Sequence, residues 1–376
     1  MSDTSMITSQ PDTSTGDIEA IVTRYRDVLE RHQGEHHAIL MQDYPEPDAI
    51  SCAFAHQLIA AQYDIQTTIF YARRISHQEN LALVNLLDIE LVRFDKDEVD
   101  LETFDGVVLV DTQGGNVSLL ERTRRADIPV LIIIDHHELQ ERPDVEFEDI
   151  RPLEAAATMF VQYMRQGMLT MSADQREHVE LATALMHGLH TETGGFINAG
   201  RSEFHAAAWL SNYYNPTLLS RILRQLRSKA VMEIIRRALA NREIRENYSL
   251  SGIGYLRSGD RDGIPQAADF LLTEENVHTV IVYGLVANDD GTENVVGSLR
   301  TVKVTLDPDE LLKNAFGRGQ QGDYFGGGKR MAGGFEIPVG FLAGNQDEEY
   351  RKLKWQVYDV QVRQRFFSQL GVGDDE

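Results

Sequence analysis

The chain has 376 residues and a formal net charge of −23, which excludes a polybasic surface for nucleic acid or membranes over the whole molecule. Its length is sufficient for two domains with separate cores. The single cysteine, Cys52, excludes an intrachain disulfide and indicates a reducing, cytoplasmic location. Because no apolar run reaches the length of a membrane span, we expect no membrane partner.

The first 150 residues alternate between predicted strands and helices. Residues 1–17 are rich in Ser, Thr and Asp without an apolar pattern, so we predict a disordered tail. Short β-branched apolar runs predict strands, and the stretches between them predict helices. This alternation predicts an α/β fold with a doubly wound parallel sheet. The predicted strands are His37–Gln42, Gln66–Ala72, Glu90–Phe94, Val107–Val110 and Val130–Ile134, and the helices are Asp48–Ala61, His77–Leu87 and Val117–Arg125.

The pattern then changes to helical spacing, and strands return near residue 255. The predicted helices are Glu154–Gln166, Asp174–Met186, Glu203–Tyr213, Ala230–Glu246, Ile264–Thr273 and an amphipathic helix within Asp347–Leu370; the strands are Tyr255–Leu256, Thr279–Val286, Asn294–Val304 and Phe335–Phe341. We therefore predict a sheet domain at 18–200, a helical linker at 201–247, a smaller α+β domain at 248–345, and a helix and tail at 346–376.

Acidic and histidine residues follow three of the predicted strands. The run Val130–Ile134 leads directly into Asp135, His136 and His137, Asp111 follows Val107–Val110, and Glu46 and Asp48 follow the first strand. The carboxyl ends of parallel strands meet at one edge, where α/β sheets place ligand groups. Acids gathered there would repel one another unless a cation neutralised them, and carboxylates with an imidazole suit Mn²⁺ or Mg²⁺. A lone Asp is usually a cap, but coincidence at three strand ends favours a metal site.

Six segments carry a resemblance to a known family. From about Ile39 to Pro338, the chain resembles the DHH/DHHA1 phosphoesterases, most of all the oligoribonuclease and phosphoadenosine-phosphate phosphatase branch and more distantly the RecJ-like exonucleases. The matching segments are Gln42-Asp43-Tyr44-Pro45-Glu46-Pro47-Asp48-Ala49, Asp111, Asp135-His136-His137, Glu192-Thr193-Gly194, Ser298-Leu299-Arg300 and Gly326-Gly327-Gly328-Lys329-Arg330-Met331-Ala332-Gly333. The resemblance implies a DHH sheet domain followed by a smaller DHHA1 substrate-binding domain.

The resemblance also implies the metal ligands, with three substitutions. One position would use Asp48, Asp111, His136 and Glu192, where Glu192 replaces the family's Asp. The other would use Gln42, Glu46 and Asp111, with Gln42 in place of a His and Glu46 in place of an Asp. We expect one or two ions, Mn²⁺ or Mg²⁺, with one near-normal site and one weakened site that tilts toward Mg²⁺.

The second domain offers candidate phosphate-binding residues. Glycine lets backbone N–H groups approach a phosphate closely, so we predict a phosphate-binding loop at Gly326, Gly327 and Gly328. Arg300 next to Ser298 offers a planar guanidinium for a terminal phosphate. Lys329 and Arg330 add positive charge to an acidic protein.

We therefore predict a phosphoesterase acting on short single-stranded RNA or DNA, or on a nucleotide, with the second domain closing over the site. In this reading a bound ion activates water for in-line attack, His137 contacts the scissile phosphate and Asp135 orients a histidine. Two alternatives stay open: a catalytically impaired nucleotide-binding or regulatory protein, and a pyrophosphatase or exopolyphosphatase. Formation of a homodimer is also open.

Overall fold

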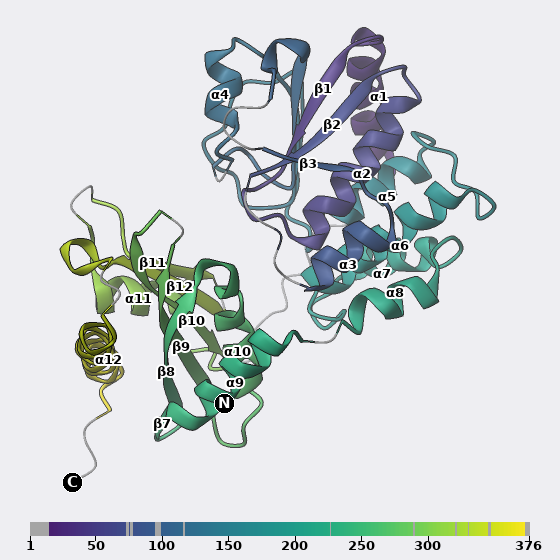
Figure 1. The fold of residues 1–376 in the computed structure, drawn as a ribbon. Helices are drawn as coiled ribbons and strands as arrows, with labels where there is room; N and C mark the ends of the chain where they lie inside the picture. Colours follow the sequence, from purple (N-terminus) through teal and green to yellow (C-terminus); the bar gives the residue numbers. More distant parts are fainter. Residues whose placement is uncertain are drawn as a thin grey trace, which may run out of the picture. The chain divides into compact units, whose positions relative to one another are not determined.

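The computed structural model describes residues 15–72, 75, 78–94, 99–115, 117–225, 227–288, 290–319, 322–329, 331–344 and 347–372. The chain divides into two compact units, Met1–Gln225 and Leu226–Glu376 (Figure 1). This division falls inside the segment 201–247 that was predicted as one helical linker. Its first helices bury Ala206, Leu210 and Ile222 in the first unit, whereas its last helix buries Ile234 and Ile235 in the second.

The first unit is built on a six-stranded parallel sheet, which confirms the predicted fold class. Its strand order is β3-β2-β1-β4-β5-β6, so the order reverses direction between the neighbours β1 and β4. The sequence did not predict the short edge strand β6. The strands are β1 (His36–Leu40), β2 (Gln66–Tyr71), β3 (Leu91–Arg93), β4 (Gly106–Val110), β5 (Val130–Asp135) and β6 (Phe147–Ile150).

Helices cover both faces of this sheet because its central strands are apolar on both sides. Ile39 and Val108 point into a core shared with α1, α2, α5 and α6, while Leu40 and Leu109 pack with Leu120 of α4 on the opposite face (Figure 1). The helices of this unit are α1 (Thr15–Arg31), α2 (Pro47–Ala61), α3 (Gln78–Leu86), α4 (Leu120–Arg125), α5 (Ala156–Arg165), α6 (Arg176–Glu192), α7 (Arg201–Leu210) and α8 (Pro216–Leu223).

Helix α1 corrects the prediction of a tail through residue 17. The helix begins at Thr15, and the rest of the predicted tail, residues 1–14, lies outside the described residues. Val22, Tyr25 and Leu29 recur at helical spacing and are buried in the core. This segment therefore folds because its apolar stripe is covered by the sheet unit.

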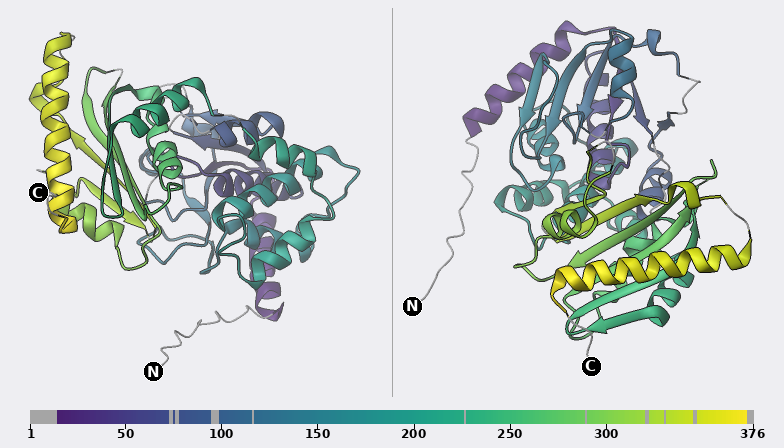
Figure 2. Two further views of the ribbon diagram at one scale, coloured as in Figure 1. Left: turned by 90° about the horizontal axis from the view of Figure 1, so that it is seen from below. Right: turned by 90° about the vertical axis from the view of Figure 1, so that its left-hand side faces the viewer.

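The second unit contains a mixed six-stranded sheet in the order β11-β12-β10-β9-β8-β7, in which β8 and β9 are parallel and the other neighbours are antiparallel. Helices α9 and α10 cover one face, and α11 and α12 the other; Figure 2 shows α12 in yellow lying across its face. The elements are α9 (Lys229–Asn241), β7 (Arg242–Arg245), β8 (Tyr248–Arg257), α10 (Gly263–Leu271), β9 (Thr279–Ala287), β10 (Glu293–Thr301), α11 (Pro308–Phe316), β11 (Gly326–Lys329), β12 (Ala332–Pro338) and α12 (Glu348–Leu370). No helix in the described part of the chain is both long and apolar enough to cross a membrane.

Three predictions for this unit need correction. The predicted helix Ala230–Glu246 stops at Asn241, and its end forms strand β7. The predicted two-residue strand at Tyr255 is the end of the ten-residue strand β8, whose Ser and Gly residues concealed its period. The predicted glycine loop is strand β11, paired with β12; side chains there would collide with Leu312 of α11 and with the neighbouring backbone.

Candidate metal centre

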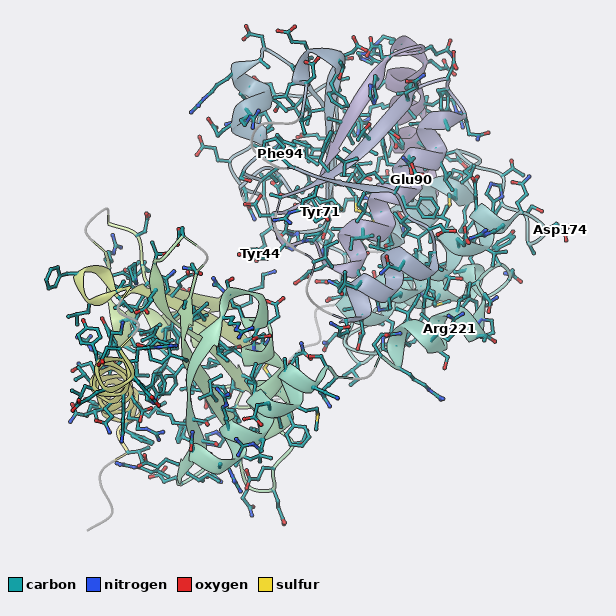
Figure 3. The ribbon with its side chains drawn as sticks, viewed as in Figure 1. Tyr44, Tyr71, Glu90, Phe94, Asp174 and Arg221 are labelled. Atoms are coloured by element: carbon teal, nitrogen blue, oxygen red, sulfur yellow. The ribbon has the colours of Figure 1, made fainter. Side chains whose placement is uncertain are left out.

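The candidate site lies at the carboxyl edge of the first sheet, where the strand order reverses. Asp111 directly follows β4, and Asp135 is the last residue of β5, one strand further along. Asp111 has a φ of 58°, a left-handed conformation that Asp tolerates better than most residues. Figure 3 labels Tyr44, Tyr71 and Phe94, which belong to or follow the carboxyl ends of β1, β2 and β3. A reversal point at this edge is where α/β sheets bind ligands.

Three of the predicted site residues converge into one group. The Oδ1 atom of Asp111 lies 3.2 Å from Nε2 of His136 and 3.9 Å from Nδ1 of His137. One ligand atom from each residue fits within a span of 4.8 Å. The side chains of Asp111 and His136 are almost fully buried, whereas that of His137 is 23% exposed. The group therefore has two deep members and one that faces solvent.

Two buried atoms of this group lack hydrogen bonds. Among the described residues, neither Asp111 Oδ1 nor His136 Nε2 makes a hydrogen bond of good geometry, although they face each other. The other ring nitrogen of His136, Nδ1, donates to the carbonyl of Leu153 at 2.9 Å. This bond leaves the Nε2 lone pair for a ligand. A divalent cation would satisfy both buried atoms, so the donor set fits the expected ion.

Burial and mutual charge shift the pKa values at this edge. Burial, followed by the negative charge of Asp111, raises the pKa of Asp48 to about 7. Burial likewise raises the pKa of Asp111. Burial opposes the charge on His136, but pairing with Asp111 and the charge of Asp48 outweigh it and raise its pKa to about 10. Without a metal, the proton on His136 therefore stands where the cation would be.

Asp48 is completely buried and joins the site to two helices. Its carboxylate accepts backbone N–H bonds from Ala156 at 2.7 Å and Ala157 at 3.0 Å, the first residues of α5. A carboxylate at this position caps the helix and favours its dipole. Opposite it, Gly188 of α6 packs so closely that a Cβ atom would lie 2.9 Å from Asp48 Oδ1. Asp48 is thus fixed in place near Asp111 and His136.

Asp135 holds the histidine pair through a network that includes one unpredicted residue. It accepts hydrogen bonds from His137 Nδ1 at 2.8 Å and from the backbone N–H of His136 at 2.9 Å. Gln113 donates to its other oxygen at 2.7 Å and to the carbonyl of Glu138 at 3.0 Å. Pairing with His137 and Gln113 lowers the pKa of Asp135 despite burial. The sequence signal for Gln113 is only its place two residues after Asp111.

The three substituted ligands occupy different positions. Gln42 donates its amide to the main-chain carbonyl of Asp111 at 3.1 Å, so it lies beside the group. Glu46 is the exposed residue preceding α2. Glu192 is the partly buried last residue of α6. The described contacts thus place Gln42 next to the metal-binding group.

A cavity of about 950 Å³ borders this group in the first unit. Gln42 and Gln113 line it on the side of the metal-binding group, while Tyr44, Arg124 and Arg142 line the rest. The volume is in the range of small-molecule sites. Arg124 pairs with Glu121 and Arg142 with Glu148, and Asp43 and Glu141 also line the cavity, so its wall carries no excess of positive charge.

In the second unit, three predicted substrate residues share one sheet face. Arg300 of β10 pairs with Ala332 of β12, which in turn pairs with Lys329 of β11. Directly paired residues project to the same face, as does Ser298 two residues from Arg300. Arg300 binds Asp269 of α10 at 2.7 Å and Ser298 at 2.8 Å. In this row, Arg300 and Lys329 lie on either side of Ala332, on the sheet face that α10 covers.

The glycine triplet differs from the predicted phosphate-binding loop. The backbone N–H of Gly328 donates to Asp309 Oδ1 at 3.1 Å, so a carboxylate takes one of the donors that a phosphate would need. Gly326 and Gly328 are packed against α11, where a Cβ would fall within 3.0 Å of a neighbour. Gly327 lies between them in the same strand. Arg330 lies outside the described residues.

No protein-family model matches this chain. An uncharacterised protein from Methanocaldococcus jannaschii is 31% identical over 342 residues. The match covers 90% of this chain but 65% of the archaeal protein, so the chain spans less than two thirds of that relative's length.

The fold also occurs in solved structures. An exopolyphosphatase-related protein from Bacteroides fragilis superposes with a TM-score of 0.65 at 16% identity, covering 92% of this chain and 98% of the other. RecJ from Thermus thermophilus in complex with Mn²⁺ gives a TM-score of 0.43 at 14% identity, covering 92% and 55%. An exonuclease RecJ bound to manganese gives 0.40 at 15% identity, covering 92% and 96%. The likeness to the exopolyphosphatase-related protein shows that the two chains share a fold.

Proposed function

We propose that this protein is a divalent-metal-dependent phosphoesterase that cleaves phosphodiester or phosphomonoester bonds in short oligonucleotides or nucleotides. The observation that carries the proposal is the buried pair Asp111 Oδ1 and His136 Nε2, 3.2 Å apart and without hydrogen bonds among the described residues. One carboxylate and one imidazole are ligands that Mn²⁺ accepts readily, and Mg²⁺ is the oxygen-preferring alternative. A bound ion would stabilise the phosphoryl charge and lower the pKa of the attacking water.

The surrounding residues have separate roles in this proposal. His137 donates Nδ1–H to Asp135, which leaves its Nε2 for a phosphate oxygen. Its pairing with Asp135 raises the pKa of His137, which favours the charged form of the ring that would stabilise a phosphate. Asp135 and Gln113 fix the ring, and Asp48 holds α5 and α6 close to the ligands.

Two features support a nucleotide substrate of the kind cleaved by the oligoribonuclease and phosphoadenosine-phosphate phosphatase branch. The cavity beside Gln42 offers Tyr44, 57% exposed, for stacking on a base. The row of Arg300, Ser298 and Lys329 in the second unit offers cations beside Ala332, where a sugar–phosphate backbone can approach.

The decisive experiment measures mononucleotide release from short single-stranded RNA, with Mn²⁺, with Mg²⁺ and with a chelator. We expect metal-dependent turnover that falls at least about 100-fold in His136→Ala. His205→Ala, at an exposed histidine of α7, is the matched control and should retain activity. Activity in the chelator, or full activity of His136→Ala, would contradict the proposal.

The same assay separates the alternatives. Release of phosphate from pyrophosphate or polyphosphate, with RNA untouched, would favour the pyrophosphatase or exopolyphosphatase. Tight binding of RNA or nucleotide without turnover in either metal would favour the nucleotide-binding protein.

A further inference from the structure

A second histidine–carboxylate cluster lies at the amino end of the same sheet, remote in the strand direction from the carboxyl edge. His32 follows α1, Glu35 directly precedes β1, and His37 is the second residue of β1. We call His32, Glu35 and His37 the amino-end cluster. Its members were not among the predicted site residues, and the proposed phosphoesterase does not use them. A metal bound at the amino-end cluster would therefore be independent of the proposed phosphoesterase site.

The two imidazoles converge on one oxygen. His32 Nδ1 lies 2.8 Å and His37 Nε2 lies 2.9 Å from Oε2 of Glu35. The three atoms lie within 4.8 Å of one another. His37 is fully buried, while the side chains of His32 and Glu35 are 14% and 32% exposed. The cluster has a fixed inner wall and an opening to solvent.

A residue behind the cluster prepares His32 for a metal. Glu146, just before β6, lies with Oε1 3.2 Å from Nε2 of His32. A carboxylate that holds one ring nitrogen as N–H leaves the other nitrogen with a lone pair, as in many metal sites. The second oxygen of Glu146 pairs with Arg31, which keeps this carboxylate behind the ring. Nδ1 of His32 bonds Glu35, and if a cation replaced the proton on Nδ1, Glu146 would hold the remaining proton on Nε2.

We propose that the amino-end cluster binds one borderline divalent cation of the zinc type through His32 Nδ1, Glu35 Oε2 and His37 Nε2. Two imidazoles and one carboxylate are a common zinc donor set, with ligand distances of about 2.0–2.2 Å. Tetrahedral ligands at those distances stand about 3.4 Å apart, so each ring nitrogen must move only about half an ångström away from the Glu35 oxygen. The exposed side of His32 and Glu35 leaves the fourth position for water.

One buried atom sets the expected affinity. Nδ1 of His37 is buried without a hydrogen-bond partner among the described residues. When the metal takes Nε2, that nitrogen must carry the proton and remains unpaired, which weakens binding. We therefore expect a dissociation constant in the micromolar range, far weaker than that of closed zinc sites. A bound ion would join the end of α1 to β1 and raise the midpoint of thermal unfolding.

The test uses the full chain, dialysed against Zn²⁺ and analysed for bound metal per chain. Because the carboxyl edge could also take Zn²⁺, the measurement is made in the His136→Ala background, alone and with a second substitution. We expect one bound zinc per chain in His136→Ala. Adding His32→Gln should abolish this zinc binding or weaken it at least about tenfold. The control substitution is His36→Gln. His36 directly precedes His37 in β1, but its ring bonds Thr68 Oγ1 rather than Glu35.

Cobalt binding gives a second readout that does not depend on enzymatic activity. Co²⁺ in a four-coordinate site with two imidazoles should give visible absorption that His36→Gln preserves and His32→Gln removes. Circular dichroism confirms that each variant is folded. Equal zinc content and equal cobalt absorption with and without His32→Gln would overturn the proposal, and so would the absence of zinc from His136→Ala.

Discussion

At the carboxyl edge of the first sheet, Asp111 and His136 are almost fully buried, whereas at the amino end His32 and Glu35 are partly open to solvent. The buried pair has shifted pKa values and atoms without hydrogen bonds, while Glu35 already accepts two good hydrogen bonds. Both clusters combine imidazole with carboxylate. The difference shows that burial, rather than residue type, decides how strongly such a cluster needs a cation.

The largest effect is expected for a substitution of Asp111. Asp111→Asn keeps the shape of the side chain but removes the negative charge that pairs with His136. We expect Mn²⁺ affinity at the carboxyl edge to fall at least about 100-fold, because a direct ligand is lost, and hydrolysis to fall with it. Calorimetric titration with Mn²⁺ measures the change. Unchanged Mn²⁺ affinity would show that Asp111 is not a ligand.

The next largest effect is the pH dependence of the metal-free protein. The folded-state pKa of His136 is about 10, above the usual 6.5, so its stabilisation is complete below pH 6.5 and is lost as pH rises through 10. The pKa of Asp48 is about 7 instead of 3.8, so its contribution is already lost as pH rises through 7.

In a chelator, we therefore expect the free energy of unfolding to fall by several kcal/mol between pH 6.5 and 10. Mn²⁺ should flatten this decline, because the ion replaces the proton on His136. Denaturant unfolding at several pH values, with and without Mn²⁺, measures both slopes. If the free energy of unfolding declined equally with pH in Mn²⁺ and in chelator, the ion would not replace the proton on His136.

A packing change tests the carboxyl edge without altering a ligand. In Gly188→Ala, the new Cβ would meet Ser51 Oγ at 2.7 Å and Asp48 Oδ1 at 2.9 Å. We expect a loss of about 1–3 kcal/mol of stability, because α2 and α6 must move apart. Thr191→Ala, at an exposed position of the same helix, is the control and should change stability by less than about 0.5 kcal/mol. Equal stability of the two variants would mean that the helices adjust freely.

A positioning residue gives a smaller effect. Gln113→Leu removes the hydrogen bonds to Asp135 and Glu138 while keeping a similar volume. We expect kcat to fall about 10-fold to 100-fold, with little change in KM. The pKa of the His137 imidazole, followed by NMR, should move as well, since Asp135 would lose an oriented partner. A stability loss with no change in kcat or in the His137 pKa would indicate a purely structural role.

The sequence predicted the carboxyl-edge group because strand order follows from simple rules. Apolar strands ending in Asp111 and Asp135 must meet at one edge of a parallel sheet, and the structure brings Asp111, His136 and His137 together there. The ligand roles of Glu46 and Glu192 stay predictions, because the position of a side chain at a helix end depends on how the helices pack. Gln113 was missed because a neutral amide after a strand carries no chemical signal of its own.

The glycine triplet and the amino-end cluster show why the rest could not be predicted. Gly326 and Gly328 have the composition of a loop, but close packing against Leu312 and Pro308 requires glycine in a strand. His32, Glu35 and His37 meet only because α1 returns the chain to the start of β1. Since α1 was not predicted, the turn that brings His32 to Glu35 had no place in the sequence-based fold.

The smallest effect is expected at the amino end, for a substitution of Glu146. Glu146→Gln keeps a hydrogen-bond acceptor for His32 Nε2 but removes the carboxylate charge, which is 41% exposed. We expect Zn²⁺ affinity to fall only about two- to fivefold, because charge effects at exposed positions are weak and screened by salt. Zinc titration at low and high salt measures this, and the difference should shrink at high salt. A loss of affinity as large as that expected for Asp111→Asn at the carboxyl edge would mean that Glu146 is itself a ligand, and that the amino-end cluster is more enclosed than its exposed side chains indicate.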